Sequence, residues 1–385
     1  MRRALATLAL IAALSLVSAS AAPAATVSDA RLDRALEKLV SLKGGPPGAS
    51  VVLRRAGRQR FLTAGVADLE TERPFRADKR MRIASVSKAF SGAVVLSLVD
   101  DGVLSLDDTL AQRLSSAPPA WGAVTLRQVA SHTGGIPSFT KDPGYLESFS
   151  TNLHGQLAMP ELVAFVADEP LQFAPGSGYE YSNTDNILMA LVAEAATGRS
   201  YDELLEAAVF APLGLSRTRL PSGFRLPGPK IHGYDVLPKQ DLTECCSMDF
   251  VAASGGLYST PRELTRFVRG YVAGELFGGE AREQQFEFRE GGASEPPGPG
   301  RNSGGLALFR YQTSCGTVFG HTGNFPGYTQ FTASTRSGRR ALTFSVNRQL
   351  APDAIGKRAV EVFEVLRRDY RLAVCALLGR GSGSS

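Results

Sequence analysis

The chain has 385 residues and a formal net charge of +5 at pH 7, and 43% of its residues are hydrophobic. This length exceeds the usual size of one hydrophobic core and indicates a large domain or two interleaved ones. The composition is ordinary for a soluble globular protein. Lysine and arginine are scattered along the chain and form no basic stripe, so the sequence does not support nucleic-acid binding.

The first 24 residues have the organisation of a secretory signal peptide. Arg2-Arg3 precede an apolar run from Ala4 to Val17, which small residues and Ala22-Pro23-Ala24 follow. The run is short for a membrane-spanning helix, and it has no cysteine for lipid attachment. We therefore expect a mature chain that starts near Ala25, has a net charge of +3 once the two arginines are removed, and is secreted, extracellular and associated with the cell wall. We expect no stable membrane insertion.

Export also affects the four cysteines, Cys245, Cys246, Cys315 and Cys375, because disulfides persist in oxidising compartments. Four cysteines permit three pairings. The Cα atoms of adjacent residues are about 3.8 Å apart, below the usual disulfide range, so a bond between Cys245 and Cys246 would be strained. We expect a Cys315–Cys375 disulfide, with the adjacent pair reduced or unusual.

The N-terminal part predicts a helix, a hairpin and a second helix. Apolar residues recur at helical spacing from Val27 to Leu42, and two short strands, Ala49–Arg54 and Arg60–Val66, form an antiparallel pair. The segment from Ser85 to Val99 is nearly all small or apolar, and Gly102 follows where a helix stop is expected, which predicts a buried central helix.

The rest of the chain predicts a helical region and then the remainder of the sheet. Helical patterns alternate with Pro and Gly breaks from Leu104 to about Gly233, and Gly274 to Gly305 reads as a surface loop. The later elements are four strands and a closing helix: Gly305–Tyr311, Gly316–Phe319, Tyr328–Thr335, Ala341–Val346 and Asp353–Tyr370. We expect an α/β (α+β) fold in which residues 25–103 and 234–385 build the sheet-containing domain and 104–233 a mainly α-helical domain, with a cleft between them.

The tetrad Ser85-Val86-Ser87-Lys88 places a hydroxyl and an amine one helical turn apart. Residues three apart on a helix share a face, so the amine can activate the serine without a histidine base. The spacing alone is weak evidence, because Ser138-Phe139-Thr140-Lys141 has the same pattern but precedes Asp142-Pro143-Gly144, which is typical of a turn.

Two further motifs support the first tetrad. Tyr181-Ser182-Asn183 lies on a loop at a helix start, where Tyr181 offers a phenol that shuttles a proton and Asn183 an amide for Lys88 or a substrate. His321-Thr322-Gly323 follows a strand, where the glycine permits close approach of a substrate backbone and the other two offer donors.

These motifs, in this order, resemble the serine β-lactamase and penicillin-binding-protein superfamily, and the tyrosine form of the second motif narrows the match to the S12-type serine hydrolases. With histidine at His321 in the third motif, the chain most resembles a secreted D-alanyl-D-alanine carboxypeptidase/transpeptidase. The resemblance implies a β-lactamase/transpeptidase-like fold with an antiparallel sheet flanked by helices. The resemblance also implies that Ser85 is the acylated nucleophile and that Lys88 and Tyr181 act as a coupled acid/base pair. The backbone N–H groups of Ser85 and Asn324 would then form the oxyanion hole.

One departure bears on substrate choice. A carboxypeptidase must hold the terminal carboxylate of its substrate, and Arg310 is the candidate clamp. Counted back from Cys315, however, Arg310 is one residue out of step with the family arginine, and Phe309 falls at the expected place. A shift of one residue turns a strand side chain to the opposite face, which leaves esterase or amidase chemistry open.

The sequence predicts no metal and no cofactor, because the acidic residues near 100 and 107 flank helix ends without converging histidines. His132-Thr133-Gly134 duplicates the third motif but reads as a helix end. In the third motif itself, the imidazole of His321 predicts a pH-sensitive pocket.

The leading hypothesis is a monomeric, secreted serine hydrolase that acts through a Ser85 acyl-enzyme on cell-wall D-alanyl peptides. A β-lactamase, an esterase or an amidase of the same family is the alternative for a small peptide, ester or β-lactam substrate. A binding module for cell-wall peptides or β-lactams, without turnover, is the hypothesis from another class.

Overall fold

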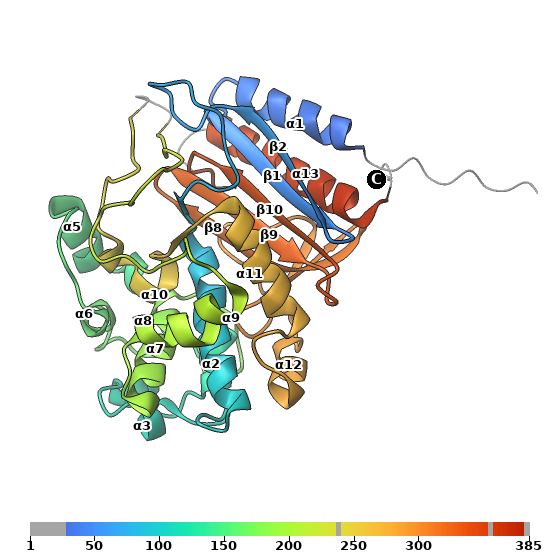
Figure 1. Cartoon of the computed structure of the whole chain (residues 1–385). Coiled ribbons are helices and arrows are strands. Elements are labelled where there is room, and N and C mark those ends of the chain that lie inside the picture. Colours follow the sequence, from blue (N-terminus) through green and yellow to red (C-terminus); the bar gives the residue numbers. More distant parts are fainter. Residues whose placement is uncertain (1–27, 236–239, 353–356, 381–385) are drawn as a thin grey trace, which may run out of the picture.

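The computed structural model describes residues 28–235, 240–352 and 357–380, so the predicted signal peptide lies outside the described residues. An eight-stranded sheet with helices on both faces stands beside a mainly helical region (Figure 1). The helices are α1 (Asp29–Ser41), α2 (Ser87–Asp100), α3 (Leu110–Arg113), α4 (Leu126–Ala130), α5 (Pro143–Thr151), α6 (Met159–Ala164), α7 (Asn183–Thr197), α8 (Tyr201–Leu205), α9 (Ala211–Leu213), α10 (Ala252–Gly255), α11 (Pro261–Ala273), α12 (Gly279–Gln285) and α13 (Lys357–Leu378). The strands are β1 (Gly48–Arg55), β2 (Arg58–Gly65), β3 (Met81–Arg82), β4 (Tyr258–Ser259), β5 (Arg289–Glu290), β6 (Arg301–Gly304), β7 (Phe309–Thr313), β8 (Gly316–Phe325), β9 (Tyr328–Ser334) and β10 (Arg340–Val346).

The large sheet joins strands from both ends of the chain in the order β2-β1-β10-β9-β8-β7-β6-β5, and every neighbouring pair is antiparallel. The β1–β2 hairpin turns at Ala56-Gly57, where both residues have positive φ (48° and 77°), as a tight two-residue turn requires. The predicted antiparallel sheet flanked by helices is confirmed. The boundaries of the two predicted domains stay a prediction.

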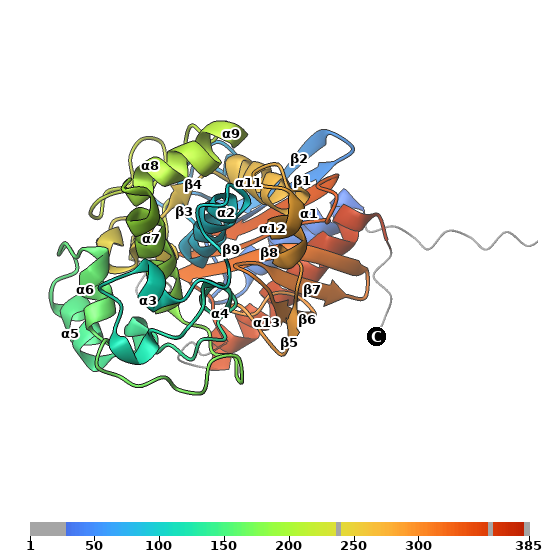
Figure 2. The same ribbon diagram turned by 90° about the horizontal axis from the view of Figure 1, so that it is seen from below.

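Helices cover both faces of the sheet. α1 and α13 pack on one face and α11 on the other (Figures 1 and 2). The apolar stripe of α1, Leu32, Leu36 and Leu39, is fully buried at this interface. The Cys315–Cys375 disulfide ties the turn between β7 and β8 to α13, as predicted.

The central helix α2 is buried between the sheet side and the helical region. Its residues are buried almost all around, which is what a nearly continuous apolar sequence predicts. Gly92 permits close packing, because a Cβ at this position would lie 2.3 Å from the Cβ of Ala307. The helix ends before Gly102, whose φ is 71°, in agreement with the predicted stop.

Several predicted boundaries are wrong. The segment Gly274–Gly305, predicted as a loop, contains α12, β5 and β6. The strand predicted from Gly305 begins at Phe309, because Ala307 has a φ of 47° and donates its N–H to the Ala130 carbonyl instead of to a strand. β8 runs through the third motif to Phe325, and α13 reaches Leu378.

Among the described residues, no helix is long and apolar enough to span a bilayer. Nor does this part of the chain gather three or more His, Cys, Asp or Glu side chains in a group suited to a metal ion.

Candidate active site

Ser85 lies in a 3-10 turn, η1 (Ala84–Val86), directly before α2 and not in the first turn of the α-helix. Ala84 has a φ of 52°, a strained conformation for alanine, so the backbone turns sharply before the candidate nucleophile. The Ser87 hydroxyl supports this turn, since it donates to the Ala84 carbonyl at 2.7 Å and accepts the Leu257 N–H at 3.2 Å.

Lys88 meets Ser85 as the spacing predicts. Its Nζ lies 3.2 Å from the Ser85 Oγ and 2.7 Å from two acceptors, the Asn183 Oδ1 and the Ser254 carbonyl. Burial lowers the pKa of Lys88 from 10.5 to about 7, against the opposing charge of Glu295. A neutral amine keeps both short bonds with its two hydrogens and turns its lone pair to Ser85.

Asn183 is held by residues that the sequence did not single out for the site. Its N–H donates to the Ser138 Oγ at 3.0 Å, and its side-chain amide donates to the Thr140 Oγ1 at 2.8 Å. These bonds fix the carbonyl end of the amide toward Lys88. The second Ser-x-x-Lys segment therefore orients Asn183, a role that only the folded chain reveals.

Tyr181 places its phenol beside the same two groups. The Lys88 Nζ lies 5.0 Å from the centre of the Tyr181 ring. Burial raises the pKa of Tyr181 well above its usual value, and the nearby Ser85 hydroxyl opposes this rise. The buried phenolic oxygen has no hydrogen-bond partner of good geometry among the described residues. Tyr181 is therefore a protonated phenol in this site.

His321 is a neutral acceptor and not the predicted pH switch. Its Nδ1 contacts the Thr322 carbonyl, which can only accept, so Nδ1 carries the ring proton and Nε2 carries the lone pair. Burial, together with the charge of Lys88, lowers the pKa of His321 to about 3, against the hydrogen bond to the Thr322 carbonyl. The prediction that imidazole titration makes the pocket pH-sensitive near neutrality is wrong, because the ring stays neutral there.

Thr322 points away from the cavity and fixes a loop. Its hydroxyl donates to the Pro296 carbonyl at 2.6 Å and lies 2.7 Å from the Ser294 Oγ. Glu295, between these two residues, lines the cavity. The third motif thus positions the segment that carries this acidic side chain, which the sequence analysis did not identify.

Gly323 brings β8 against the nucleophile. A Cβ at this position would lie 2.4 Å from the Ile83 carbonyl oxygen and 3.2 Å from the Ser85 nitrogen. Pairing of β7 with β8 ends at Gly320, so Asn324 lies beyond this ladder and lines the cavity next to Ser85. The placement of Ser85 and Asn324 suits the predicted oxyanion hole, which stays a prediction.

Arg310 does not reach the site. It bonds Glu290, donates to the Ser303 Oγ at 3.1 Å and lies over the Phe288 ring. Phe309 faces the site instead, with its ring centre 4.9 Å from that of His321. The assignment of Arg310 as a substrate-binding residue is therefore wrong, because the residue points to the opposite face of β7.

The candidate residues surround a cavity of about 730 Å³. Ser85, Tyr181, Asn183 and Asn324 line it, and Lys88 lies directly behind Ser85. Among the described residues that line the cavity, Lys141 carries the positive charge, and its ammonium group forms an ion pair with Glu180. The cleft therefore offers room for a small acyl donor around Ser85.

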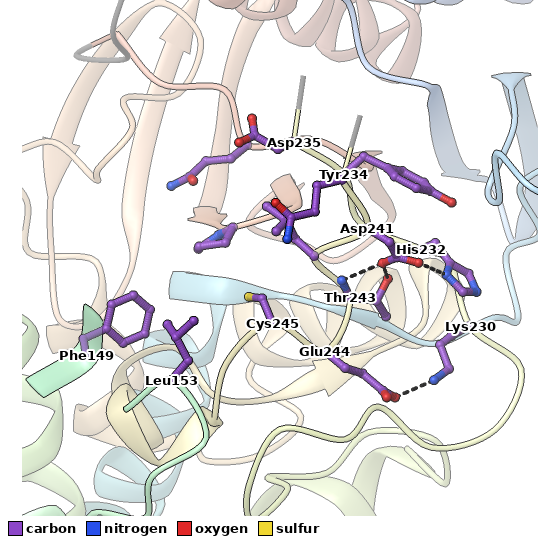
Figure 3. A pocket seen from close by; sticks show the side chains of 14 residues that line it. Phe149, Leu153, Lys230, His232, Tyr234, Asp235, Asp241, Thr243, Glu244 and Cys245 are labelled. Atoms are coloured by element: carbon purple, nitrogen blue, oxygen red, sulfur yellow. Dashed lines mark hydrogen bonds and ion pairs between the residues drawn. The ribbon is translucent and has the colours of Figure 1, made fainter. Parts of the chain in front are cut away.

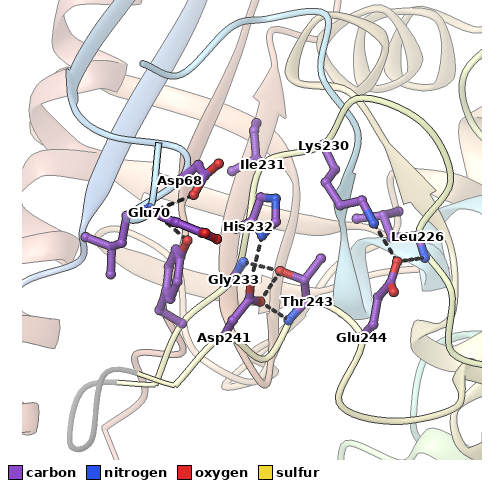
Figure 4. Close-up of polar contacts among 12 residues, drawn as sticks. Asp68, Glu70, Leu226, Lys230, Ile231, His232, Gly233, Asp241, Thr243 and Glu244 are labelled. Atoms are coloured by element: carbon purple, nitrogen blue, oxygen red, sulfur yellow. Dashed lines mark hydrogen bonds and ion pairs between the residues drawn. The ribbon is translucent and has the colours of Figure 1, made fainter. Parts of the chain in front are cut away.

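A second cavity of about 590 Å³ adjoins the first, and both are lined by Phe149, Pro326 and Gln349. Figure 3 shows Phe149 and Leu153 on one side of it and charged side chains on the other. Figure 4 shows these charges bonded in pairs within the wall. The pairs are Lys230 with Glu244 at 2.5 Å and His232 with Asp241 at 2.6 Å.

The two remaining cysteines lie between this second cavity and η1. Cys245 lines the cavity, while Cys246 is buried and packs with Ala84 and Phe325. Their Sγ atoms are 2.7 Å apart, and both are free thiols in the structure. This pair, predicted to be reduced or unusual, therefore lies against the turn that presents Ser85.

The sequence of the chain is similar to that of known proteins. The family model described as Beta-lactamase matches residues 30–366. The chain is 24% identical over 310 residues to penicillin-binding protein 4* of Bacillus subtilis, covering 74% of this chain and 64% of that protein. It is 33% identical over 216 residues to esterase EstB of Burkholderia gladioli, covering 51% and 52%. These alignments thus span between half and two thirds of the two relatives.

Solved structures match nearly the whole chain. A D-stereospecific amidohydrolase from Streptomyces sp. has a TM-score of 0.74 and 29% sequence identity, covering 87% of this chain and 98% of that one. D-amino acid amidase from Ochrobactrum anthropi has a TM-score of 0.75 and 25% identity, covering 89% and 96%.

Proposed function

The chain belongs to the beta-lactamase family of serine hydrolases, and from this premise we propose that it cleaves small amides, esters or peptides through an acyl-enzyme on Ser85. The contact set of Lys88 carries the proposal: two short bonds to acceptors and a third, longer approach to the Ser85 Oγ. An amine with a pKa of about 7 that is held in this way accepts the serine proton near neutral pH.

The remaining groups then have defined roles. The Ser85 oxygen attacks the carbonyl carbon while its proton passes to Lys88, and the backbone N–H groups of Ser85 and Asn324 stabilise the developing oxyanion. Tyr181 gives its proton to the leaving group as the bond to the carbonyl carbon breaks. Transfer of a proton from the Lys88 ammonium to the Tyr181 phenolate restores both groups before water hydrolyses the acyl-enzyme.

The charges around the cleft favour acyl donors without a free carboxylate next to the scissile bond. Arg310 faces away, His321 is buried and neutral, and Lys141 is paired with Glu180. D-alanyl-D-alanine carboxypeptidase activity thus stays a prediction that these three positions disfavour. Amide or ester hydrolysis agrees with the activities that give the amidase, amidohydrolase and esterase relatives their names.

Intact-mass spectrometry tests the proposal. The protein is mixed in turn with a penicillin, a D-alanyl-D-alanine peptide, a D-amino acid amide and 4-nitrophenyl acetate, and the acyl adduct is followed with time. We expect an adduct that disappears in Ser85→Ala and persists in Ser97→Ala, a matched serine on α2. Equal labelling of Ser85→Ala contradicts the proposal. Adducts that form with every reactive acyl donor and never decay would favour the binding module.

A further inference from the structure

A buried pair of polar side chains, His132 and Asp185, lies behind Tyr181 and has no role in the steps above. The His132 Nδ1 is 2.7 Å from the Asp185 Oδ2, and the two side chains are only 4% and 2% exposed. His132 directly follows α4, as the sequence predicts, and Asp185 lies in the first turn of α7. Two segments far apart in the sequence thus meet at this pair.

The hydrogen bonds around the pair locate its proton. The His132 Nδ1 also accepts the backbone N–H of Ser182 at 3.4 Å, which requires a lone pair on that nitrogen. That nitrogen has one lone pair, so we assign the proton between Nδ1 and Oδ2 to Asp185, which donates it at 2.7 Å, while the Ser182 N–H makes a longer, secondary contact with the same lone pair. The Asp185 Oδ1 is buried and has no hydrogen-bond partner among the described residues, a situation that is costly for a carboxylate and milder for a neutral acid.

The electrostatic surroundings agree with this assignment. Burial raises the pKa of Asp185 well above its usual value and lowers the pKa of His132 well below its own. The charged or titratable groups that act on the two are Lys88 and His321, and His321 is neutral. The pair thus holds one proton and no net charge.

His132 holds the backbone on both sides of Tyr181. Its carbonyl accepts the Glu180 N–H at 3.0 Å and its Nδ1 accepts the Ser182 N–H. The imidazole also packs on the Tyr181 ring, with the ring centres 4.7 Å apart and the planes tilted by 46°. Loss of the imidazole therefore frees the Ser182 N–H and one ring face of Tyr181, while the backbone bond to Glu180 remains.

We propose that His132 and Asp185 form a positioning dyad that holds the Tyr181 phenol beside Ser85 without adding charge next to Lys88. The proposal rests on the function proposed above, because it assigns the dyad to the proton donor of that mechanism. Neutrality matters for the base as well. A full negative charge on Asp185 would favour the ammonium form of Lys88 and so remove the lone pair that accepts the serine proton.

A pair of aryl acetates that differ in the leaving group tests the dyad. The 4-nitrophenolate of 4-nitrophenyl acetate departs without a proton, whereas the poorer leaving group of phenyl acetate gains from the Tyr181 proton. Both esters give the same acetyl-enzyme, so the leaving group is compared in kcat/KM, which reports acylation. In His132→Ala and Asp185→Ala, we expect kcat/KM for phenyl acetate to fall about tenfold or more and kcat/KM for 4-nitrophenyl acetate to fall less than about threefold, because a displaced general acid forfeits part of a contribution of about 10² to 10⁴.

Asp185→Asn separates the positioning role of Asp185 from any effect of its charge. This variant also keeps the proposal testable if the alanine variants do not fold. Its amide donates to the His132 Nδ1 as the protonated acid does, so we expect near wild-type rates on both esters and an unshifted pH profile. Asp369→Ala, at a buried acid on α13, controls for a general loss of stability and should leave the ratio of the two ester rates unchanged.

Two outcomes overturn the dyad: equal losses on the two esters in the alanine variants, or a lowered pKa of the kcat/KM limb in Asp185→Asn, which would reveal a charged Asp185. Failure of the proposed function has a different signature, namely ester hydrolysis that survives in Ser85→Ala.

Discussion

Substitution of Gly323 by alanine tests the proposed oxyanion hole most directly. The added Cβ would lie 2.4 Å from the Ile83 carbonyl oxygen, whereas real Cβ atoms essentially never approach closer than 3.0 Å. Because that oxygen belongs to backbone, β8 and η1 must separate by roughly 0.6 Å, which moves the Asn324 N–H away from Ser85. Loss of one oxyanion donor costs about 2.7–4 kcal/mol, or about 10²–10³ in kcat.

The assay is steady-state hydrolysis of 4-nitrophenyl acetate, with thermal unfolding of each variant measured in parallel. We expect kcat to fall at least about 30-fold in Gly323→Ala, since the donor is displaced and not removed. Gly278→Ala is the matched control, because a Cβ there meets nothing within 4 Å. A Gly323→Ala enzyme that is folded and within about threefold of wild-type kcat would refute the assignment of Asn324 to the oxyanion hole.

Three other predictions concern charge in and near the cleft. First, kcat/KM should increase with pH around an apparent pKa near 7, because only the neutral amine of Lys88 accepts the serine proton. Below pH 6, kcat/KM should drop about tenfold for each pH unit. A kcat/KM that is constant from pH 5 to 8 contradicts this prediction. Second, His321→Gln should leave that limb unmoved, since the imidazole is already neutral across the range, and a limb displaced by one unit would assign the titration to His321. Third, Arg310→Ala should keep kcat/KM for peptides and amides within about threefold, because this guanidinium pairs with Glu290 outside the cleft, and a large rise in KM for carboxylate-bearing peptides alone would restore it as a clamp.

The sequence predicts the reacting groups because their spacing is a local property. Ser85 and Lys88 are three residues apart, and the turn before α2 keeps them within 3.2 Å of each other. The tyrosine and asparagine of the second motif straddle a helix start, so their placement also follows from a short stretch of chain. The hydrophobic periodicity of α1 and the turn at Ala56-Gly57 are local in the same sense, and both predict their elements.

The supporting groups depend on tertiary contacts that no local pattern encodes. Ser138 orients Asn183 across 45 residues of sequence, and Ser254 reaches Lys88 across 166. Neither residue is distinctive in its own segment. His132 looked like a helix end and is one, but its contact with Asp185 becomes visible only when α4 and α7 pack together. The prediction of a loop from Gly274 to Gly305 was wrong for a related reason. Short elements such as β5 and α12 are stabilised by contacts with neighbouring elements, and their own hydrophobic periodicity does not reveal them.

The third motif shows how one substitution changes the electrostatics of a conserved geometry. A lysine at position 321 would bring a cation and three donors to the edge of β8, whereas the imidazole is held by the Thr322 carbonyl and its Nε2 is buried. With Arg310 also turned away, neither β7 nor β8 contributes a cationic side chain to the lining of the cavity beside Ser85 in the described part of the chain. The acyl transfer proposed for Ser85 and Lys88 needs no cation at this edge, so we expect acyl donors without a carboxylate beside the scissile bond to react at least as fast as those that carry one.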